Sequence, residues 1–359
     1  MCRNPLHCVV PPYLIDAVIR SGSDRQREWA LRTLRADHRI RSARVTNLKT
    51  RAGGPREGAD ALAGASAIPA PDRIIRDAQG SWEVSGIPIV RREGEPATGD
   101  ADADRVYDFF GDTHAFWHDV FGRNSIDDEN MPLRGVVHFG EEYDNAFWDG
   151  RRMVFGDGDG ELFVSFTRSL DVIGHELGHG ITEDEGPLEY WGQSGALNES
   201  LSDVWGSLVK QRKLGQSADQ ADWLIGAEVI GDEFDGVAIR SMSNPGSAYD
   251  DAVLGKDPQP KHWDDYVRTF EDEGGVHINS GIPNHAFWRL ATQLGGNAWE
   301  RPGRIWYDAL RSRNLSTTST FRQFARITFD VATRRYGAGS AEADAVEAAW
   351  DFVGVRWPT

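Results

Sequence analysis

Two histidines and a glutamate are the first candidates for chemistry in this chain. In the stretch DVIGHELGHGIT, His175 and His179 are four positions apart, with Glu176 beside the first. On an α-helix such a pair lies on one face, one turn apart, so both imidazoles can bind one Zn²⁺. Gly174 and Gly178 weaken a helix, but small residues would let another element approach closely. Alone, the stretch fits both a zinc site and a polar stripe on an ordinary helix.

A third ligand separates these two interpretations, because a catalytic zinc usually has three protein ligands and one open position. The stretch GALNESLSD, residues 195–203, follows the histidines and offers Glu199. Asp203, on the same helical face, could accept the second ring N–H of a zinc-bound histidine, and Asn198 could do similar work. An amphipathic helix with solvated carboxylates is the alternative. The two segments together favour zinc.

Peptide hydrolysis at such a zinc needs a base and hydrogen-bond donors. Zinc lowers the pKa of a bound water toward about 7, and Glu176 is placed to take its proton and deliver it to the leaving amine. The attacked carbonyl becomes an oxyanion, which needs further donors. His277 in GGVHINSG, with Asp272 to hold its ring, and Tyr190 are the candidates. A lone histidine is more often structural, but the flanking glycines and the nearby acid favour function.

Composition narrows the class of protein. The chain has 359 residues and a formal net charge of −17 at pH 7, which argues against nucleic acid as the main partner, because phosphate binding needs clustered Lys and Arg. No stretch approaches the roughly 18 apolar residues of a membrane span, and no ordinary signal peptide is visible. Both cysteines, Cys2 and Cys8, lie at the N-terminus, so the rest of the fold is expected to have no disulfide.

Hydrophobic periodicity predicts the elements that position these residues. Residues 9–43 predict two helical segments, and the Gly-, Ala- and Pro-rich residues 50–71 predict a linker; the alternative for this N-terminal part is a flexible tail. Residues 72–168 are β-rich, with a helix expected at ADADRVYDFFGDTHAFWHDVFG. From residue 169 onward helical spacing dominates. The fold class is therefore α+β, with the HELGH helix joining a β-rich half to an α-rich half.

Three separated motifs, HELGH, GALNESLSD and GGVHINSG, resemble in order and spacing the thermolysin family of zinc metallopeptidases. NAFWDG, MVFGDGDG and IRSMSNP are similar to its other landmarks, and the resemblance covers roughly residues 72–356. It implies a two-lobed endopeptidase whose cleft is floored by the HELGH helix. The β-rich N-terminal lobe would span residues 69–184 and the mainly α-helical C-terminal lobe residues 185–359.

The resemblance also implies roles for individual residues. One catalytic Zn²⁺ would be bound by His175, His179 and Glu199, with Asp203 and Asn198 behind the ligands. Glu176 would be the general base, His277 and Tyr190 the transition-state donors, and Asp272 would orient His277. The substrate backbone would bind Asn145, Ala146 and Trp148 on an edge strand, and Arg240 beyond the cut. An apolar pocket would favour cleavage before Leu, Phe, Ile or Val, and its lining would be Phe163, Phe166, Val172, Ile225, Val229 and Ile239.

Calcium binding is expected to depart from the family pattern. The family's paired calcium site needs several carboxylates, and Lys210, Leu224 and Ala227 stand where acids would be expected. A lysine ammonium could replace one cation's charge among the acids that remain, which are Asp171, Asp222 and Glu228. We therefore predict that the double calcium site is missing or reduced, although Ca²⁺ binding remains possible. The DGD of residues 157–159 predicts a tight turn, with a weak cation site as the alternative.

The N-terminal stretch CVVPPYLIDAVI resembles the short propeptide of the protealysin-like subgroup. Residues 1–68 would then be a propeptide and linker that cover the cleft and are removed by the enzyme itself. Cys8 is a candidate to block the zinc with its thiolate, or it is a small buried side chain. Family habit implies secretion, with a cytoplasmic location as the alternative. The alternatives to an active endopeptidase are a silent homologue that binds peptides and a structural zinc protein, which would prefer mostly Cys ligands.

Overall fold

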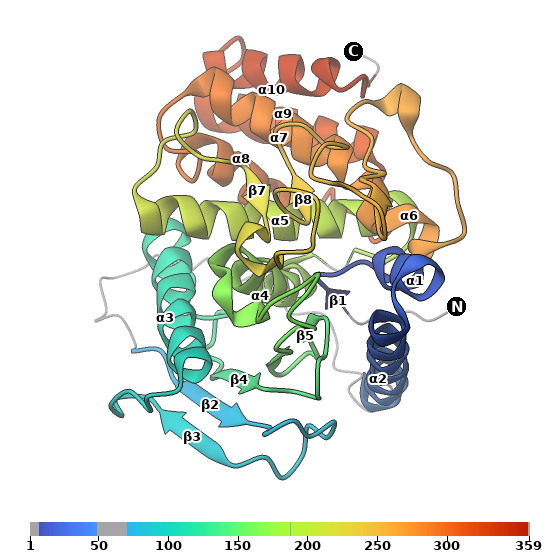
Figure 1. Cartoon of the computed structure of the whole chain (residues 1–359). Helices are drawn as coiled ribbons and strands as arrows, with labels where there is room; N and C mark the ends of the chain where they lie inside the picture. Colours follow the sequence, from blue (N-terminus) through green and yellow to red (C-terminus); the bar gives the residue numbers. More distant parts are fainter. Residues whose placement is uncertain (1–6, 49–69, 187, 358–359) are drawn as a thin grey trace.

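The computed structural model describes residues 7–48, 70–186 and 188–357. A β-sheet lies at one end of the molecule and a layer of helices at the other, with two long helices, α4 and α5, between them (Figure 1). This arrangement confirms the predicted α+β architecture. The predicted linker falls almost wholly on residues 49–69, which lie outside the described residues.

One mixed sheet builds the first lobe. Its strand order is β1-β5-β6-β4-β2-β3, in which β2, β4 and β6 are parallel and the other pairs are antiparallel. The strands are β1 (His7–Cys8), β2 (Arg73–Asp77), β3 (Ile89–Arg92), β4 (Leu133–Val137), β5 (Ala146–Trp148) and β6 (Met153–Phe155). Helix α3 (Ala101–Phe121) packs on one face of the sheet, where Val106 and Phe110 lie beside Gly135 of β4.

The local sequence explains where α3 begins and ends. The side chain of Asp100 accepts hydrogen bonds from the backbone N–H groups of Asp102 and Ala103, which caps the first turn. Gly122 follows the last turn with φ of 72°, a left-handed conformation that glycine adopts without steric cost. The helix therefore matches the predicted segment closely.

Helices α4 (Leu170–Glu185) and α5 (Gly192–Leu214) are buried along most of their length. A helix that is buried all round tolerates close neighbours only where side chains are small. Gly174 of α4 lies against Gly206 of α5: a Cβ added to Gly206 would come within 2.2 Å of the Asp171 carbonyl oxygen. The two glycines thus let the helix backbones approach each other, as was predicted for Gly174 but not for Gly206.

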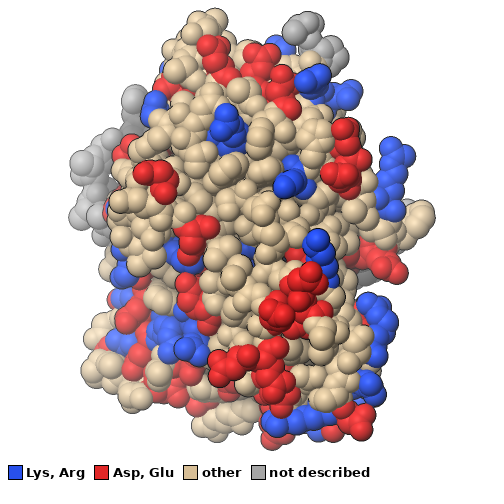
Figure 2. Space-filling model, turned by 45° about the horizontal axis from the view of Figure 1, so that its top comes forward, with Lys and Arg blue, Asp and Glu red and all other residues tan. Residues whose placement is uncertain are grey.

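The second lobe is mainly helical and lies above α5 in Figure 1. Its helices are α6 (Asp272–Asn279), α7 (Gly281–Leu294), α8 (Arg301–Leu310), α9 (Phe321–Tyr336) and α10 (Ala341–Phe352). Its two short hairpins pair β7 (Leu224–Ile225) with β8 (Arg240–Ser241) and β9 (Asp250–Asp251) with β10 (Gly255–Lys256). Acidic and basic side chains are interspersed over the face shown in Figure 2.

The N-terminal module consists of β1 and two helices, α1 (Pro12–Ser21) and α2 (Asp24–Leu48). Pro12 stands at the start of α1, where a missing N–H costs nothing. Leu14, Ile15 and Val18 of α1 are buried. This burial confirms the predicted helix and contradicts the alternative of a flexible tail. Within the described ranges, no helix is both long and apolar enough to cross a membrane.

The predicted β-rich stretch after Met153 forms less strand than expected. Beyond β6 the chain turns, because the Oδ1 atom of Asp159 accepts backbone N–H bonds from Glu161, Leu162 and Phe163 at 2.8, 2.8 and 2.9 Å. A carboxylate that caps three N–H groups fixes a turn. The turn therefore lies over residues 159–163, just after the DGD at which a tight turn was predicted.

Candidate active site

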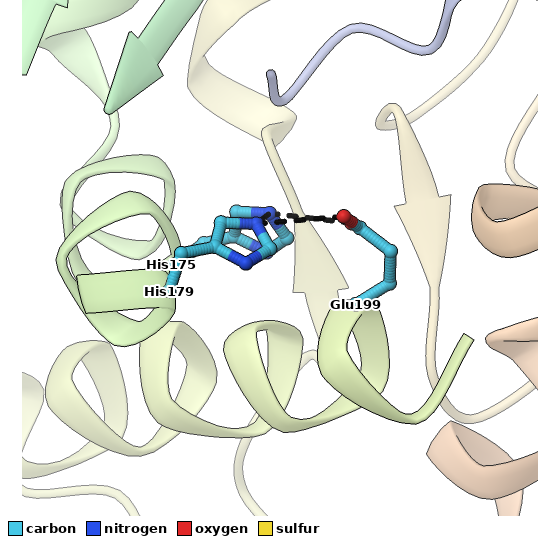
Figure 3. Close-up of side chains that lie close together, drawn as sticks. All are labelled: His175, His179 and Glu199. Carbon is cyan, nitrogen blue, oxygen red and sulfur yellow. Dashed lines mark hydrogen bonds and ion pairs between the residues drawn. The ribbon is translucent and has the colours of Figure 1, made fainter. Parts of the chain in front are cut away.

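Helices α4 and α5 bring the three predicted ligands together. His175 and His179 project from α4 toward Glu199 of α5 (Figure 3). The two Nε2 atoms are 3.0 Å apart, and each lies 3.5 Å from an oxygen of the Glu199 carboxylate. The three ligand atoms all lie within 4.8 Å of one another, and all three side chains are buried, so they could hold one metal ion.

Each histidine is oriented through its other ring nitrogen. His175 Nδ1 lies 2.8 Å from Asp203 Oδ1, and His179 Nδ1 lies 2.7 Å from Asn198 Oδ1. With Nδ1 occupied, Nε2 of each ring faces the shared point. Ser202, which we did not predict, lies 3.0 Å from His179 Nδ1. The predicted supporting residues therefore stand behind the predicted ligands, an arrangement that commonly fixes tautomer and ring orientation.

Asp203 is itself held by partners from distant segments. Arg240 donates to both of its oxygens, at 2.9 and 3.0 Å, and Asn284 Nδ2 donates to Oδ2 at 2.8 Å. Burial alone would raise the pKa of Asp203, but the charges of Arg240 and His175 outweigh it and hold that pKa below its usual range. Asp203 is thus an ionised, fully bonded support for His175.

Glu176 lies on the same helical stretch and is buried. Its Oε2 atom accepts a hydrogen bond of 3.1 Å from the backbone N–H of Trp148, in β5. This contact ties the carboxylate to the edge of the sheet that was predicted to bind substrate. A carboxylate held next to both the ligands and the substrate strand is suited to move a proton between water and substrate.

His277, Tyr190 and Asp272 converge on the other side of the ligands. His277 Nδ1 lies 2.5 Å from Asp272 Oδ1, and the backbone N–H of His277 donates to Asp272 Oδ2 at 2.8 Å. The Tyr190 hydroxyl lies 3.3 Å from His277 Nε2 and also donates to the Glu199 carboxylate. Burial lowers the pKa of His277, but the Glu199 and Asp272 carboxylates outweigh it and raise that pKa to about 9. A protonated ring can donate toward an oxyanion.

The segment that carries Asp272 has an unusual backbone. Asp272 and Glu273 have φ of 52° and 48°, and the next two residues, Gly274 and Gly275, are also left-handed. Side chains other than glycine rarely adopt this conformation, and such strain is often found at functional sites. Here the bend turns the Asp272 carboxylate back onto His277 at the start of the regular helix.

The predicted substrate strand is occupied by the chain's own N-terminus. Strand β1 pairs antiparallel with β5, with Cys8 opposite Phe147. The backbone N–H of Val9 donates to the Ala146 carbonyl at 3.3 Å, and that of Val10 donates to Asn145 Oδ1 at 3.1 Å. This is the backbone pairing expected of an extended peptide added to a sheet edge.

The carbonyls of this strand meet one predicted catalytic residue and one predicted substrate-binding residue. The Cys8 carbonyl lies 3.3 Å from His277 Nε2, and Arg240 Nη1 donates to the Val9 carbonyl at 2.9 Å. Val9 is 0% exposed and belongs to one buried cluster with the predicted pocket residues. Those residues are Phe163, Phe166, Val172, Ile225, Val229 and Ile239.

The Cys8 side chain lies away from this pocket. It packs in a second cluster, with Phe147 and Tyr143, on the other face of the sheet. Cys8 does not belong to the group of described side chains whose ligand atoms converge at His175. The thiolate contact with zinc therefore stays a prediction, and it would require a rotation of the strand that the present pairing does not show.

Lys210 of α5 lies among the acids that remain from the double calcium site, which was predicted to be missing or reduced. Its ammonium lies 2.9 Å from Asp171, 3.1 Å from Asp222 and 3.2 Å from Glu228. Burial would lower the pKa of Lys210, but the carboxylates of Asp171 and Glu228 outweigh it and raise that pKa. A fixed positive charge therefore sits among the three remaining acids.

A second group, Asp100, Asp102 and His138, also has ligand atoms within 4.8 Å of one another but is partly exposed. His138 Nδ1 lies 2.9 Å from Asp157, and its hydrogen bond and charge contacts raise the pKa of His138 to about 9. Metal binding needs the neutral ring, so a histidine that is protonated at neutral pH is a poor ligand. We interpret this group as an ion-pair cluster.

Two family models together cover most of the chain. The model of the thermolysin metallopeptidase catalytic domain matches residues 73–183, and the model of the alpha-helical domain matches residues 186–355. The chain therefore belongs to the thermolysin family of metallopeptidases. It is a zinc metalloendopeptidase, as the motifs predicted.

Full-length similarity extends to individual proteins. An extracellular metalloprotease of Pectobacterium carotovorum subsp. carotovorum is 49% identical over 99% of this chain and 98% of that protein. Protease PrtS of Photorhabdus sp. (strain Az29) is 44% identical over 91% and 86%. The precursor of protealysin from Serratia proteamaculans matches with a TM-score of 0.86 and 47% identity, over 98% of this chain and 100% of that chain. These matches confirm the protealysin-like subgroup and fit a chain made as a zymogen.

Proposed function

We propose that His175, His179 and Glu199 hold one catalytic Zn²⁺ and that Glu176 is the general base. The observation that carries this proposal is the convergence of the three ligand atoms within 4.8 Å, next to Glu176 in a buried site. Two imidazoles and one carboxylate are a donor set typical of catalytic zinc. A bound Zn²⁺ would supply Lewis-acid chemistry to the attacking water and the substrate carbonyl.

The chain's own groups would move the proton and bind the developing charge. Glu176, held by the Trp148 N–H, takes a proton from water and delivers it to the leaving amine. His277 and Tyr190 donate hydrogen bonds to the oxyanion, and Asp272 fixes the ring of His277. Elemental analysis tests the ligand set: one zinc per chain is expected in the wild type and much less in Glu199→Gln, and equal zinc in both would contradict it.

Substrates are proposed to bind as the N-terminal strand does, antiparallel to β5. Asn145 and Ala146 would bind the substrate backbone, and Arg240 would bind the carbonyl after the cut. In support of this proposal, Asn145 bonds Val10, and Ala146 and Arg240 bond Val9, in the present structure. The residues predicted to line the pocket after the cut are apolar and share one buried cluster with Val9, so cuts before Leu, Phe, Ile or Val are expected. Mass mapping of fragments from an unfolded protein tests this: cuts mainly before charged residues would contradict it.

Autoprocessing is proposed to release the N-terminal module. The strand β1 lies in the substrate position, so the precursor is blocked until residues 1–68 are removed in or near the linker. Proteins and peptides would then be the partners of the free cleft. Secretion is proposed as well, because the Pectobacterium relative is named extracellular. Activity confined to the cytoplasm of the producing cells would contradict that proposal.

The double calcium site is proposed to be replaced by Lys210. Removal of a buried charge partner costs about 3–5 kcal/mol, so Lys210→Met should lower the Tm markedly, and added Ca²⁺ should restore part of the loss. Lys213→Met is a matched control, because Lys213 makes an exposed ion pair, with Asp112, worth about 0–1 kcal/mol. The wild-type Tm should not change with a calcium-selective chelator; a large fall would contradict the proposal.

A further inference from the structure

A cavity of about 380 Å³ lies between β2, β4 and the turn that joins β5 to β6. Four arginines line it, together with the segment 84–87: Arg76, Arg134, Arg151 and Arg152. Among the described residues that line this arginine pocket there is no acid. So dense a positive charge is unusual for a chain whose net charge is −17, and it would attract anionic groups locally.

Two of these arginines bond the backbone of the pocket wall, and the guanidinium groups of the other two could bind a ligand. Arg76 and Arg152 donate to the carbonyls of Ile87 and Val84, the latter at 2.5 Å, and Arg152 also pairs with Asp149 at 3.0 Å. Arg134 and Arg151, by contrast, have no side-chain hydrogen bond or ion pair within the described part of the chain. Free guanidinium groups in a concave site can bind a carboxylate through two parallel N–H···O bonds.

The position of the arginine pocket relates it to the cleft. Strand β5 ends at Trp148, and the turn that follows it carries Arg151 and Arg152 into β6. His7 pairs with Trp148, so a chain that lies along β5 and continues toward its own N-terminus runs past Asp149 to this turn. Because extended residues advance about 3.3 Å each, only a few residues are needed to reach it.

The register sets the distance from the cut. The Cys8 carbonyl lies at His277, so Cys8 occupies the position just before the bond to be cut, and His7 the second position. If the substrate continues in this register, its third, fourth and fifth positions would pass Asp149, Gly150 and Arg151 of the turn. Side chains alternate along an extended chain, so the third and fifth positions share the face of Cys8, whose cluster includes Ile87 of the pocket wall.

We propose that the arginine pocket binds Asp or Glu side chains at the third and fifth positions of the substrate before the cut. This inference deepens the proposed function and rests on it, because it requires substrates to lie along β5 in the register of the N-terminal strand. The pocket adds a charge preference on the amino side of the bond to the apolar preference after it. It also offsets the repulsion between an acidic substrate and this acidic enzyme.

Paired peptides test the proposal with the full chain after it has processed itself. The two peptides are identical, with Leu after the cut, except for Glu or Gln at both the third and the fifth position before it. The wild type should cut the Glu peptide with a kcat/KM roughly three- to tenfold higher than the Gln peptide at low salt, less at high salt. Arg134→Gln and Arg151→Gln should each bring this ratio toward one.

Arg313→Gln is the matched control, because Arg313 is exposed, lies outside the arginine pocket and loses the same charge. It should keep the wild-type ratio. A wild-type ratio of one, with both peptides cut, would overturn the inference and leave the proposed function standing. An equal loss in Arg313→Gln would assign the effect to overall charge and overturn it too. If neither peptide is cut, the proposed function fails first and this inference with it.

Inorganic phosphate provides a second measurement. If phosphate raises the Tm of the wild type but not of Arg134→Gln, while the peptide ratio is one, the arginine pocket is a site for small free anions and the substrate proposal is wrong. If phosphate instead lowers the Glu-peptide preference of the wild type by competition, the proposal is supported.

Discussion

His277 shows how single residues would divide the work at the proposed site. Its ring nitrogen Nδ1 contacts Asp272, while Nε2 faces the position that the Cys8 carbonyl fills in the precursor. A ring fixed on one side can donate only toward the other, so its hydrogen bond is aimed before substrate arrives. Such preorganised donors contribute mainly to the transition state rather than to substrate binding.

His277→Gln should therefore lower kcat by about 10²–10³-fold, the usual loss for one oxyanion donor, with a smaller change in KM. The measurement is steady-state cleavage of a short peptide by the processed enzyme, together with its zinc content, which should stay at the wild-type level. His285→Gln is the control: His285 is also a buried histidine, but its ring bonds the Lys261 carbonyl and not a residue of the proposed site. Equal losses in both variants would contradict the role of His277.

The sequence predicts some residues of the proposed site and misses others. His175, His179 and Glu199 follow from spacing within two helices, because a helix fixes which residues share a face. Ser202 and Asn284 were missed. Asn284 reaches Asp203 from a helix 81 residues away, and no local pattern reports a contact of that kind. The Cys8 thiol was considered as a zinc ligand, but strand pairing turns its side chain toward Phe147 and its carbonyl toward His277.

At the scale of elements, the distance between α4 and α5 decides whether the ligands meet. Two ligands come from one helix and the third from the other, so any separation of the helices would pull Glu199 away from the histidines. Gly174 and Gly206 permit the present distance. Both are poor residues for helix stability, so we infer that close packing is the reason that they stand there.

Gly206→Ala should weaken both the fold and the site. The new Cβ would lie 2.2 Å from the Asp171 carbonyl oxygen, so the helices must move apart. Such overpacking costs about 1–3 kcal/mol, and we expect a lower Tm and weaker zinc retention during dialysis. Gly303→Ala is the control, because its Cβ would come no closer than 3.1 Å to a neighbour, the end of the Leu208 side chain. A Gly206→Ala protein with wild-type Tm and zinc content would refute the packing argument.

Helices were predicted more completely than strands. The periodic segments that became α1, α3 and α4 lie close to where the sequence indicates. The stretch after Met153 has strand-like composition but gives a strand of three residues, because the turn around Asp159 satisfies the backbone there. Side-chain capping of this kind competes with sheet pairing, and β-propensity alone does not register it.

At the scale of the whole molecule, the N-terminal module and the catalytic lobes form a blocked enzyme. Charged contacts also join them: Arg25 of α2 lies 3.1 Å from Glu161 and 3.7 Å from Glu142. Exposed ion pairs contribute little each. The buried residues around Val9 and the backbone bonds of β1 are therefore expected to provide most of the affinity.

Val9→Asp should release this block early. An unpaired carboxylate in the apolar pocket costs about 3 kcal/mol or more, so β1 should leave the cleft and the unprocessed chain should cut a peptide at least tenfold faster. Val9→Leu keeps an apolar side chain and serves as the control. Activity is measured immediately after purification, with intact mass to show that the chain is unprocessed. An inactive, folded Val9→Asp precursor would show that another contact blocks the enzyme.

The most direct test of the whole account is the intact mass of the wild type and of Glu176→Gln over time, each with its zinc content. We predict one zinc in both proteins, loss of the first fifty to seventy residues in the wild type alone, and cleavage of an added peptide by the wild type alone. If the wild type binds zinc but neither processes itself nor cuts a peptide, the chain is better described as a peptide-binding homologue. If Glu176→Gln processes as fast as the wild type, Glu176 is not the base.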